Sequence, residues 1–406
     1  MRSLVGFADA DAFYSSAEVV RRPWLKDAEV GVLGNQGACV IARSYAMKRA
    51  GVKVGMPIWE AKELCPDGVY VKRDFRWYEA VSRRLLAELN LVSPRVEYHS
   101  IDEFFWKHSP VRQRDPVESA LELRDHIKQR IGVPVTVSIG RTRTLAKLFA
   151  DTHKPFGAVA VTDPMQEREL LAAIPVTEIA GIAKRRAARL EPFNIRTCLD
   201  LRDASGLLVK QLLTITGHDL WLELNGVTAQ PIRPERTPHK NIARGGSLAG
   251  RVSDPLKIYG WLVRNVERLI EELRYHVVRP RLLAVYMNYA DGAGGVGQVR
   301  LPVPADRFDV VLDAAKQCLR SAWKPGREAT HMHVIASHLA RPHAWQQSLF
   351  EGPDPRLDTL AEVKASINER FGRWKVRSGA TLFANEFYQD AANEFDICDV
   401  RGKFCF

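Results

Sequence analysis

The sequence has few cysteines and no long apolar run. Its six cysteines are scattered among 406 residues, with no Cys-x-x-Cys pair and no histidine at zinc-finger spacing, which excludes a structural zinc module. No stretch approaches the roughly 18 apolar residues of a membrane helix, and no basic segment with an apolar core begins the chain. We therefore expect reduced thiols, no membrane span and no signal peptide, as in a cytoplasmic protein.

Acidic residues are also in deficit. The chain holds 48 Asp and Glu against 59 Lys and Arg, a formal net charge of +11. Residues 235–345 contain 17 basic and 10 acidic residues, whereas residues 346–406 contain 8 and 10. This imbalance favours a polyanionic partner such as nucleic acid, bound by the middle of the chain rather than by its end.

The acids that are present form an informative pattern. Asp102 and Glu103 are adjacent and follow an apolar run, and Asp9 ends another apolar run near the start of the chain. Neighbouring carboxylates repel one another unless strand alternation separates them or a cation neutralises them. Carboxylates on two strands can hold a pair of divalent ions for phosphoryl transfer, so the pattern predicts nucleotidyl transfer.

The periodicity of apolar residues predicts a mixed α/β core followed by two further domains. Strands are expected over 3–8, 31–33, 38–42, 96–101 and 133–139, and helices over 44–50, 59–64, 76–90, 117–131 and 145–153. Residues 162–234 read as a small all-α unit and three prolines mark a linker after it. Residues 242–340 predict an α+β domain with a helix over 255–272, a strand over 282–289 and a Gly-rich turn at 292–297. One more helix is expected over 358–371.

The motifs in this order resemble the Y-family translesion DNA polymerases, and within them the UmuC type. The resemblance covers about residues 1–345. It rests on Asp9-x-Asp11-x-Phe13-Tyr14, Cys39-Val40-Ile41-Ala42-Arg43, Gly51-Val52-Lys53, Ser93-Pro94-Arg95-Val96-Glu97, Ser100-Ile101-Asp102-Glu103, Ser138-Ile139-Gly140-x-Thr142-x-Thr144-Leu145-Ala146-Lys147 and Lys154-Pro155-x-Gly157.

The resemblance implies an α/β and α+β multidomain fold. It is a right-hand polymerase with palm, fingers and thumb, plus a little-finger domain and a C-terminal tail. The expected boundaries are 1–12 and 75–161 for the catalytic palm, 13–74 for the fingers, 162–234 for a thumb with a helix–hairpin–helix, 235–241 for the linker, 242–340 for the little finger and 341–406 for the tail. The implied activity is low-fidelity, template-directed DNA synthesis past damaged bases, with primer–template DNA and a dNTP as substrates.

Carried over residue by residue, the resemblance assigns roles around the carboxylates. Asp9, Asp102 and Glu103 match the catalytic residues, and with the backbone of Ala10 they would hold two Mg²⁺ ions, whereas Asp11 is interpreted as structural. Tyr14, beside Phe13, matches the aromatic that excludes a ribose 2′-hydroxyl. The remaining nucleotide-binding positions are Ile41 over the base pair and Tyr45, Lys48 and Lys154 at the triphosphate, with Arg43 as a substitute donor because Lys48 stands where many members have Arg.

Two further motifs imply DNA and protein partners. Gly181, Ala183 and Lys184 match a phosphate-binding hairpin whose second glycine is replaced here by Ala183. Gln346, Ser348, Leu349 and Phe350 belong to a Gln-Gln-Ser-Leu-Phe segment that resembles the pentapeptide that binds the bacterial sliding clamp. SOS accessory subunits or a recombinase are further expected partners, and residues 351–406 do not match the tail of the UmuC type.

Two other readings remain open. The chain could be a non-catalytic paralogue that acts as a clamp- and DNA-binding scaffold, which primer extension with Mg²⁺ would distinguish. It could also be a nucleotide cyclase with a palm-like domain, which is disfavoured by the basic second domain and the hairpin motif.

Overall fold

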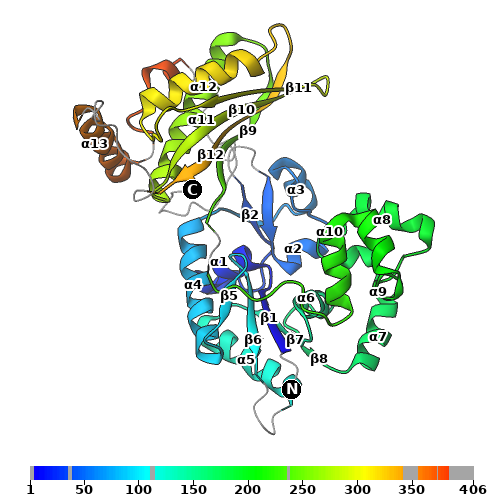
Figure 1. The fold of residues 1–406 in the computed structure, drawn as a ribbon. Coiled ribbons are helices and arrows are strands. Elements are labelled where there is room, and N and C mark those ends of the chain that lie inside the picture. The colour runs from blue at the N-terminus through cyan, green and yellow to red at the C-terminus, as the bar shows by residue number, and fades with distance from the viewer. Residues whose placement is uncertain are drawn as a thin grey trace. The chain divides into compact units, whose positions relative to one another are not determined.

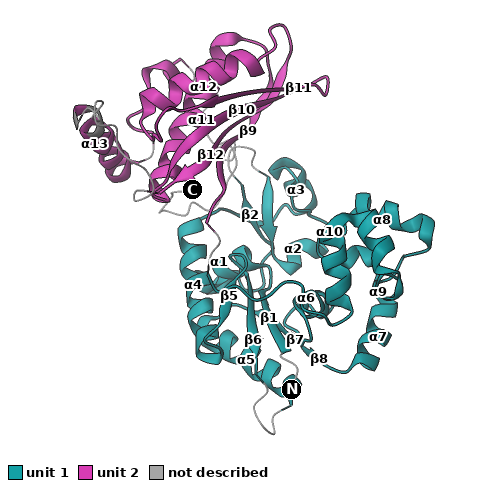
Figure 2. Ribbon diagram, viewed as in Figure 1, with its two compact units in different colours: residues 1–34, 39–236, 397–405 teal, residues 35–38, 237–396, 406 magenta. Residues whose placement is uncertain are grey.

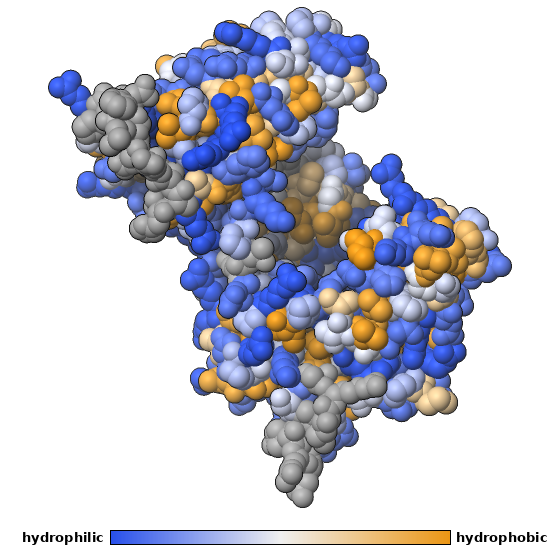
Figure 3. Space-filling model, viewed as in Figure 1, coloured by the Kyte–Doolittle hydropathy of each residue, from blue (hydrophilic) through white to orange (hydrophobic). Residues whose placement is uncertain are grey.

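The computed structural model describes residues 4–34, 39–109, 115–235, 238–341, 355–372 and 374–383. The described residues fall into two compact units, the first ending at residue 235 and the second beginning at residue 238 (Figure 2). Among these residues no helix is long and apolar enough to cross a membrane. On the face seen in Figure 3, apolar side chains are interspersed among hydrophilic ones, as is normal for a water-exposed surface.

A five-stranded sheet forms the centre of the first unit, in the order β5-β6-β1-β7-β8 (Figure 1). Its middle strand β1 is buried along its whole length and runs antiparallel to both β6 and β7. A strand that is covered on both faces reads as a continuous apolar run, which explains the sequence before Asp9. The strands are β1 (Leu4–Ala10), β5 (Val96–Tyr98), β6 (Glu103–His108), β7 (Val135–Gly140) and β8 (Ala158–Val161).

Helices cover both faces of this sheet. Alternate residues of β1 point to opposite sides, so Ala8 packs in a core with side chains of α4 (Phe75–Val92) and α5 (Pro116–Ile131), while Phe7 packs in another with Ala146 of α6 (Arg143–Thr152). Gly6 is required by close packing, because a Cβ there would lie 2.1 Å from the Trp106 ring.

The helix ends follow their sequence signals. The side chain of Asp74 caps α4 by accepting from the Trp77 amide at 3.2 Å. Asp115 caps α5, whose first residue is a proline, and the helix is followed by Gly132 with a φ of 87°. Caps of this kind satisfy amides and carbonyls that the helix cannot pair internally, so they fix where each helix starts and stops.

A smaller sheet in the order β3-β2-β4 follows the first strand. Strands β2 (Val30–Leu33) and β3 (Val40–Arg43) are antiparallel, and β4 (Val69–Lys72) is parallel to β2. The helical elements connected with this sheet are α1 (Phe13–Arg21), η1 (Pro23–Leu25), α2 (Tyr45–Arg49) and α3 (Ile58–Leu64).

Short helices complete the first unit around a separate core of mostly Leu, Ile and Val side chains. This all-α segment agrees with the expectation for residues 162–234. Its elements are α7 (Pro164–Ala173), η2 (Val176–Glu178), α8 (Lys184–Leu190), η3 (Glu191–Phe193), α9 (Cys198–Asp203) and α10 (Gly206–Leu224).

The second unit is a four-stranded antiparallel sheet in the order β11-β10-β12-β9, with α11 and α12 packed on one face (Figure 1). The strands are β9 (Asn241–Val252), β10 (Arg279–Tyr289), β11 (Gly294–Arg300) and β12 (Ala329–Ala340), and the helices are α11 (Pro255–Tyr275) and α12 (Phe308–Ala322). Two later elements, α13 (Pro355–Phe371) and η5 (Gly379–Thr381), follow. Glu267 of α11 binds Lys364 at 2.5 Å and the amide of Ser378 at 3.0 Å, which fixes this later segment to α11.

Two expectations about strands were wrong. The strand predicted over 96–101 ends at Tyr98, and a tight turn precedes β6, because the amides of His99 and Ser100 both donate to the carbonyl of Glu103. The Gly-rich turn predicted at 292–297 is shorter, since β11 already begins at Gly294. Cβ atoms on Gly295 and Gly297 would lie about 2 Å from carbonyls of α12, so these glycines serve close strand–helix packing rather than a turn.

Candidate active site

The register of β1 and β6 places Asp9 directly opposite Glu103. Asp102 lies in the turn just before β6, and its carbonyl accepts from the amide of Ala10 at 2.9 Å. Ser100 holds the side chain of Asp102, because its Oγ donates to Oδ1 of Asp102 at 2.5 Å. Carboxylates that lie far apart in the sequence thus come from adjacent strand ends of one sheet.

Lysine side chains neutralise two of these carboxylates. Lys154 donates to Oδ2 of Asp9 at 2.6 Å and also to Asp151 at 2.8 Å. Lys147, on α6, is ion-paired with Glu103. Nε2 of His99 lies 3.7 Å from Oε2 of Glu103.

Burial dominates the electrostatics of Asp9. Desolvation raises the pKa of Asp9 to about 7; Lys154 opposes this shift, while Glu103 and Asp102 add to it. A carboxylate that is buried beside other carboxylates is stabilised by a cation, and oxygen donors of this kind are the ligands that hard divalent ions prefer.

The donor chemistry therefore fits a divalent metal, although the carboxylates are not gathered around one point. Among the described residues, no group of three or more His, Cys, Asp or Glu side chains is arranged to hold a metal ion. The ammonium groups of Lys147 and Lys154 occupy Glu103 and Asp9 instead. Each lysine binds one oxygen of its carboxylate, so Oδ1 of Asp9 and Oε2 of Glu103 are not bound by these lysines.

One cavity of about 460 Å³ collects the residues that the sequence assigned to metal and nucleotide. Its lining also includes Ala12, Ala42, Val54 and Ile101, to which the sequence analysis gave no role. The predicted residues that line it are Asp9, Ala10, Phe13, Tyr14, Ile41, Arg43, Tyr45, Lys48, Asp102, Glu103 and Lys154.

An aromatic cluster fixes Tyr14 at the wall of this cavity. Its ring stacks on Tyr78 with the centroids 4.5 Å apart and meets Phe75 edge-on at 5.7 Å. Phe13 is buried beside it, with ring centroids 5.7 Å apart. Because one ring face is held by Tyr78, Tyr14 is positioned before any ligand arrives.

Basic and hydroxyl groups of β3 and α2 form another wall. Nζ of Lys48 lies 5.7 Å from the centre of the Tyr45 ring, and the hydroxyl of Tyr45 lies 3.5 Å from Oδ1 of Asp11. Nε of Arg43 is buried and has no hydrogen-bond partner among the described residues. Buried Met47 anchors α2, and Ser44 caps its first turn.

Asp11 has a different environment from Asp9. It is almost fully buried and accepts from the hydroxyl of Thr136 at 3.0 Å and from the amide of Phe156 at 2.8 Å. These contacts tie the segment after Lys154 to β7. Asp11 does not line the cavity, in agreement with its interpretation as a structural residue.

The hairpin motif lies in the all-α segment and does not line the cavity. Gly181 has a φ of 96°, the amide of Ile182 donates to the carbonyl of Ile179, and Ala183 precedes the first residue of α8, Lys184. The turn is therefore formed with Ala183 in place of glycine. The clamp-like segment at residues 346–350 lies outside the described residues.

Sequence reasoning missed the contacts around Glu97. Its Oε2 accepts from Arg143 at 2.8 Å and from the amide of Arg233 at 2.7 Å, which pins the end of the all-α segment against the sheet. It also assigned no role to Lys147, although this residue ends the motif that begins at Ser138. No local pattern predicts such contacts, because the partners lie more than 40 residues apart in the chain.

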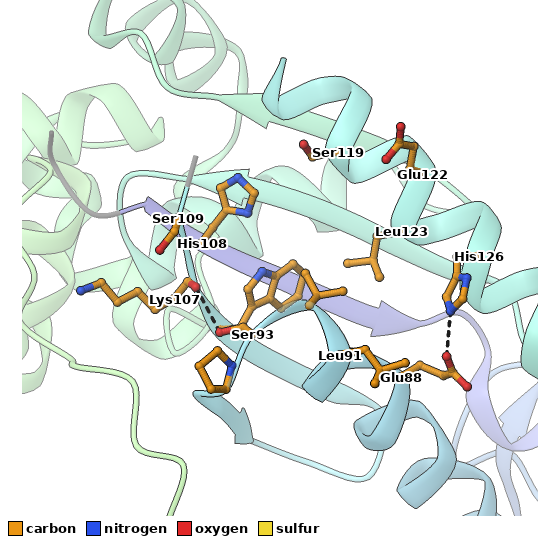
Figure 4. A pocket seen from close by; sticks show the side chains of 13 residues that line it. Glu88, Leu91, Ser93, Lys107, His108, Ser109, Ser119, Glu122, Leu123 and His126 are labelled. Atoms are coloured by element: carbon orange, nitrogen blue, oxygen red, sulfur yellow. Dashed lines mark hydrogen bonds and ion pairs between the residues drawn. The ribbon is translucent and has the colours of Figure 1, made fainter. Parts of the chain in front are cut away.

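A larger cavity of about 610 Å³ lies between α4, α5 and the end of β6 (Figure 4). Its acids, Glu88 and Glu122, come from different helices, and Glu88 is paired with His126 at 2.7 Å. Neither side chain belongs to the carboxylate set, so cavity size alone does not identify the active site here.

Comparison with known proteins agrees with this architecture. The profile of the impB/mucB/samB family matches residues 8–151, and that of its C-terminal domain matches residues 239–349. DNA polymerase IV 1 of Bacillus subtilis has a sequence 27% identical to this one, in an alignment that covers 94% of this chain and 96% of the Bacillus protein. Protein UmuC of Salmonella typhimurium is 28% identical, covering 94% and 93%. The fold resembles that of a Y-family DNA polymerase chimera of Dbh and Dpo4, with a TM-score of 0.70 at 23% identity, over 83% of this chain and 99% of the other.

Proposed function

The chain belongs to the impB/mucB/samB family of Y-family DNA polymerases, and from this premise we propose that the cavity at Asp9, Asp102 and Glu103 is its nucleotidyl-transfer site. The protein is a DNA-directed DNA polymerase of the translesion type, with a right-hand fold. The observation that carries the site proposal is that all the predicted metal- and nucleotide-binding residues line one cavity.

Two Mg²⁺ ions are the proposed cofactors of this site. Asp9, Asp102 and the carbonyl of Ala10 would hold them, and Glu103 would complete the set on the primer side. Bound ions would stabilise the charge on the attacking and leaving oxygens of the transfer. Lys154 and Lys147 would then exchange their carboxylate partners for the substrate or solvent.

The opposite wall is proposed to hold the incoming dNTP. Tyr45 and Lys48 project from one short helix, and Lys154 comes from the segment after α6, so phosphate oxygens between them would meet donors from two sides. Charge-assisted bonds of this kind stabilise the negative charge that builds up on the leaving pyrophosphate. Arg43 would supply a further donor.

Tyr14 is the proposed sugar discriminator. It is held against Tyr78 and cannot retreat into the core, so a ribose 2′-hydroxyl pressed against it would clash. Ile41 would cover the nascent base pair, and Phe13 supports Tyr14 from the core side.

Further partners follow from the same premise. We propose that primer–template DNA is held without sequence selection by the hairpin at Gly181, Ala183 and Lys184 and by the second unit. The segment at residues 346–350 is proposed to bind the bacterial sliding clamp. SOS accessory subunits or a recombinase are proposed as further partners, with no binding segment assigned to them. The palm, fingers, thumb, linker, little-finger and tail boundaries given above are proposed on the same basis.

Primer extension with purified protein and Mg²⁺ tests the site. The wild type should extend a primer past an abasic site, and Asp102→Asn should lower extension by at least a hundredfold while its DNA affinity stays within a few-fold. Glu122→Gln, which changes an acid of the other cavity, is the matched control and should extend normally. Near-normal extension by Asp102→Asn would refute the metal assignment. Absence of extension by the wild type, with DNA binding intact, would favour a scaffold role instead.

A further inference from the structure

The sheet of the second unit has an unusual distribution of charge. None of its four strands contains Asp or Glu. Residues of β10 such as Leu283, Val285 and Met287 face the core under α11 and α12, so the alternate residues, Ala284, Tyr286 and Asn288, form the outer face. This outer face is acid-free over the described strands.

Most of the arginines of these strands are already neutralised. Arg279 pairs with Asp306 at 2.8 Å and Arg251 with Glu328 at 3.2 Å. Arg244 pairs with Glu272 of α11. The acids come from helices and connections, so the sheet has fewer uncompensated positive charges than its composition suggests. Two arginines of the strands, Arg281 of β10 and Arg300 at the end of edge strand β11, take part in none of the ion pairs described for these residues.

Two histidines occupy the middle of the outer face. His331 and His333 are two residues apart on β12, which lies between β10 and β9, so both point to the same side. Across the sheet, His333 is opposite Tyr286 and His331 is opposite Asn288. On the other side, their neighbours are Gly245 and Ser247.

No acidic residue lies directly opposite this pair, and the acid nearest to it along the chain, Glu328, is paired with Arg251. The neighbouring positions on β9 and β10 carry tyrosine, asparagine, glycine and serine, and the ring of His331 contacts only Thr330 within hydrogen-bond distance, at 3.1 Å. Partial burial, and in second place the charge of His331, lower the pKa of His333. Burial thus favours the neutral form of His333 in the free protein.

We propose that protonation of His331 and His333 strengthens the contact that the second unit is proposed to make with duplex DNA, so that the polymerase holds DNA more tightly as the pH falls. The proposal rests on the proposed function, in which the second unit binds primer–template DNA. A surface without acids does not repel phosphate, and a phosphate placed over an uncompensated imidazole favours its charged form. Binding then takes up protons, and by linkage the affinity must rise as the pH is lowered.

The magnitude follows from this linkage. If DNA raises the pKa of one such histidine by about one unit, the dissociation constant falls by about fivefold between pH 8 and pH 6. With two such histidines, the dissociation constant would fall by about ten- to thirtyfold over the same pH range. Each imidazolium that contacts a phosphate would also steepen the plot of log Kd against log salt by about 0.9.

The test measures binding of the full chain to a fluorescein-labelled primer–template by anisotropy, in EDTA, at pH 6.0 and 8.0 and at several salt concentrations. The wild type should bind more tightly and with a steeper salt slope at pH 6.0. His331→Gln/His333→Gln should remove most of both differences, while His126→Gln, a surface histidine of α5 paired with Glu88, should retain them. The double variant His331→Lys/His333→Lys should bind tightly and independently of pH.

The outcomes are distinguishable. Wild-type binding that does not change with pH, or a glutamine variant that retains the full pH effect, overturns the inference and leaves the polymerase activity untouched. Failure of the wild type to bind DNA at either pH contradicts the proposed function itself. If the glutamine variant melts at a lower temperature, the lysine variant decides, because pH-dependent binding by that protein would also overturn the inference.

Discussion

Two aspartates that are two residues apart should give opposite results when each is replaced by asparagine. Asp9 faces the cavity and is proposed to hold metal, whereas Asp11 is hydrogen-bonded to the segment after Lys154. We predict that Asp9→Asn abolishes extension without destabilising the fold. Asp11→Asn should destabilise the fold and retain extension within about tenfold.

The cost of changing Asp11 follows from its donors. The amide of Phe156 and the hydroxyl of Thr136 both donate to its carboxylate. Asparagine keeps one acceptor oxygen and turns an N–H group towards the other donor. A buried donor left without an acceptor costs about 1–3 kcal/mol, so we expect a loss of that size in the free energy of unfolding.

Replacing Asp9 by asparagine should have the opposite effect on the free energy of unfolding. Its pKa is about 7 in the folded protein, above its ordinary value of 3.8, because burial disfavours the charged form. Stability is therefore lost as the pH rises through that range, and above pH 7 the folded state carries the full cost of the charge. The difference of about three pKa units between the folded and ordinary values limits this loss in the free energy of unfolding to about 4 kcal/mol. Asparagine removes this cost, so Asp9→Asn should be more stable than the wild type at pH 8 and gain little at pH 4.

Urea denaturation in EDTA at both pH values, together with primer extension in Mg²⁺, measures the two effects. Asp151→Asn removes the other partner of Lys154 and controls for loss of an ion pair to that lysine. The reasoning would be refuted if Asp9→Asn extended primers normally, or if it were less stable than the wild type at pH 8. It would equally fail if Asp11→Asn lost extension while its unfolding curve was unchanged.

The remaining predictions concern the sugar and the clamp. Tyr14→Ala should raise incorporation of ribonucleotides relative to deoxynucleotides by at least a hundredfold, because the clash at the sugar is lost; Tyr14→Phe keeps the ring and should discriminate like the wild type. Leu349→Ala/Phe350→Ala should abolish stimulation by purified sliding clamp and leave clamp-free extension unchanged, because tethering changes local concentration and not chemistry. A loss of clamp-free extension in parallel with a lower melting temperature would show that the pair packs within the fold instead.

The order of elements was predictable because apolar periodicity is local. The helix of α5 was expected over 117–131 and runs over Pro116–Ile131, bounded by a capping aspartate and a terminal glycine. The turn between β5 and β6 was missed, since it depends on backbone hydrogen bonds to Glu103 that apolar residues do not signal. The wrong Gly-rich turn has the same cause, because α12, which requires small residues in β11, is distant in the sequence.

The candidate site also has a part that local sequence motifs predict and a part that they do not. The motifs identified the carboxylates and the residues proposed to bind nucleotide, and all of these residues line one cavity. Motifs did not indicate that Lys147 and Lys154 occupy the carboxylates, because an ion pair across 44 or 145 residues leaves no local pattern. The charge around the proposed metal ligands is thus partly balanced by lysines that sequence reasoning had no means to place there.

Charge composition shows why placement decides function. The excess of seven positive charges in residues 235–345 suggested a strongly basic DNA-binding surface. In the folded unit, acids of helices and connections pair with three of the five strand arginines, Arg244, Arg251 and Arg279, so most of this excess lies outside the sheet. What distinguishes the outer face is instead the absence of acids from its strands and a pair of histidines in its centre. Because histidine titrates near neutral pH, the affinity of such a surface for phosphate depends on pH, which net charge alone would not suggest.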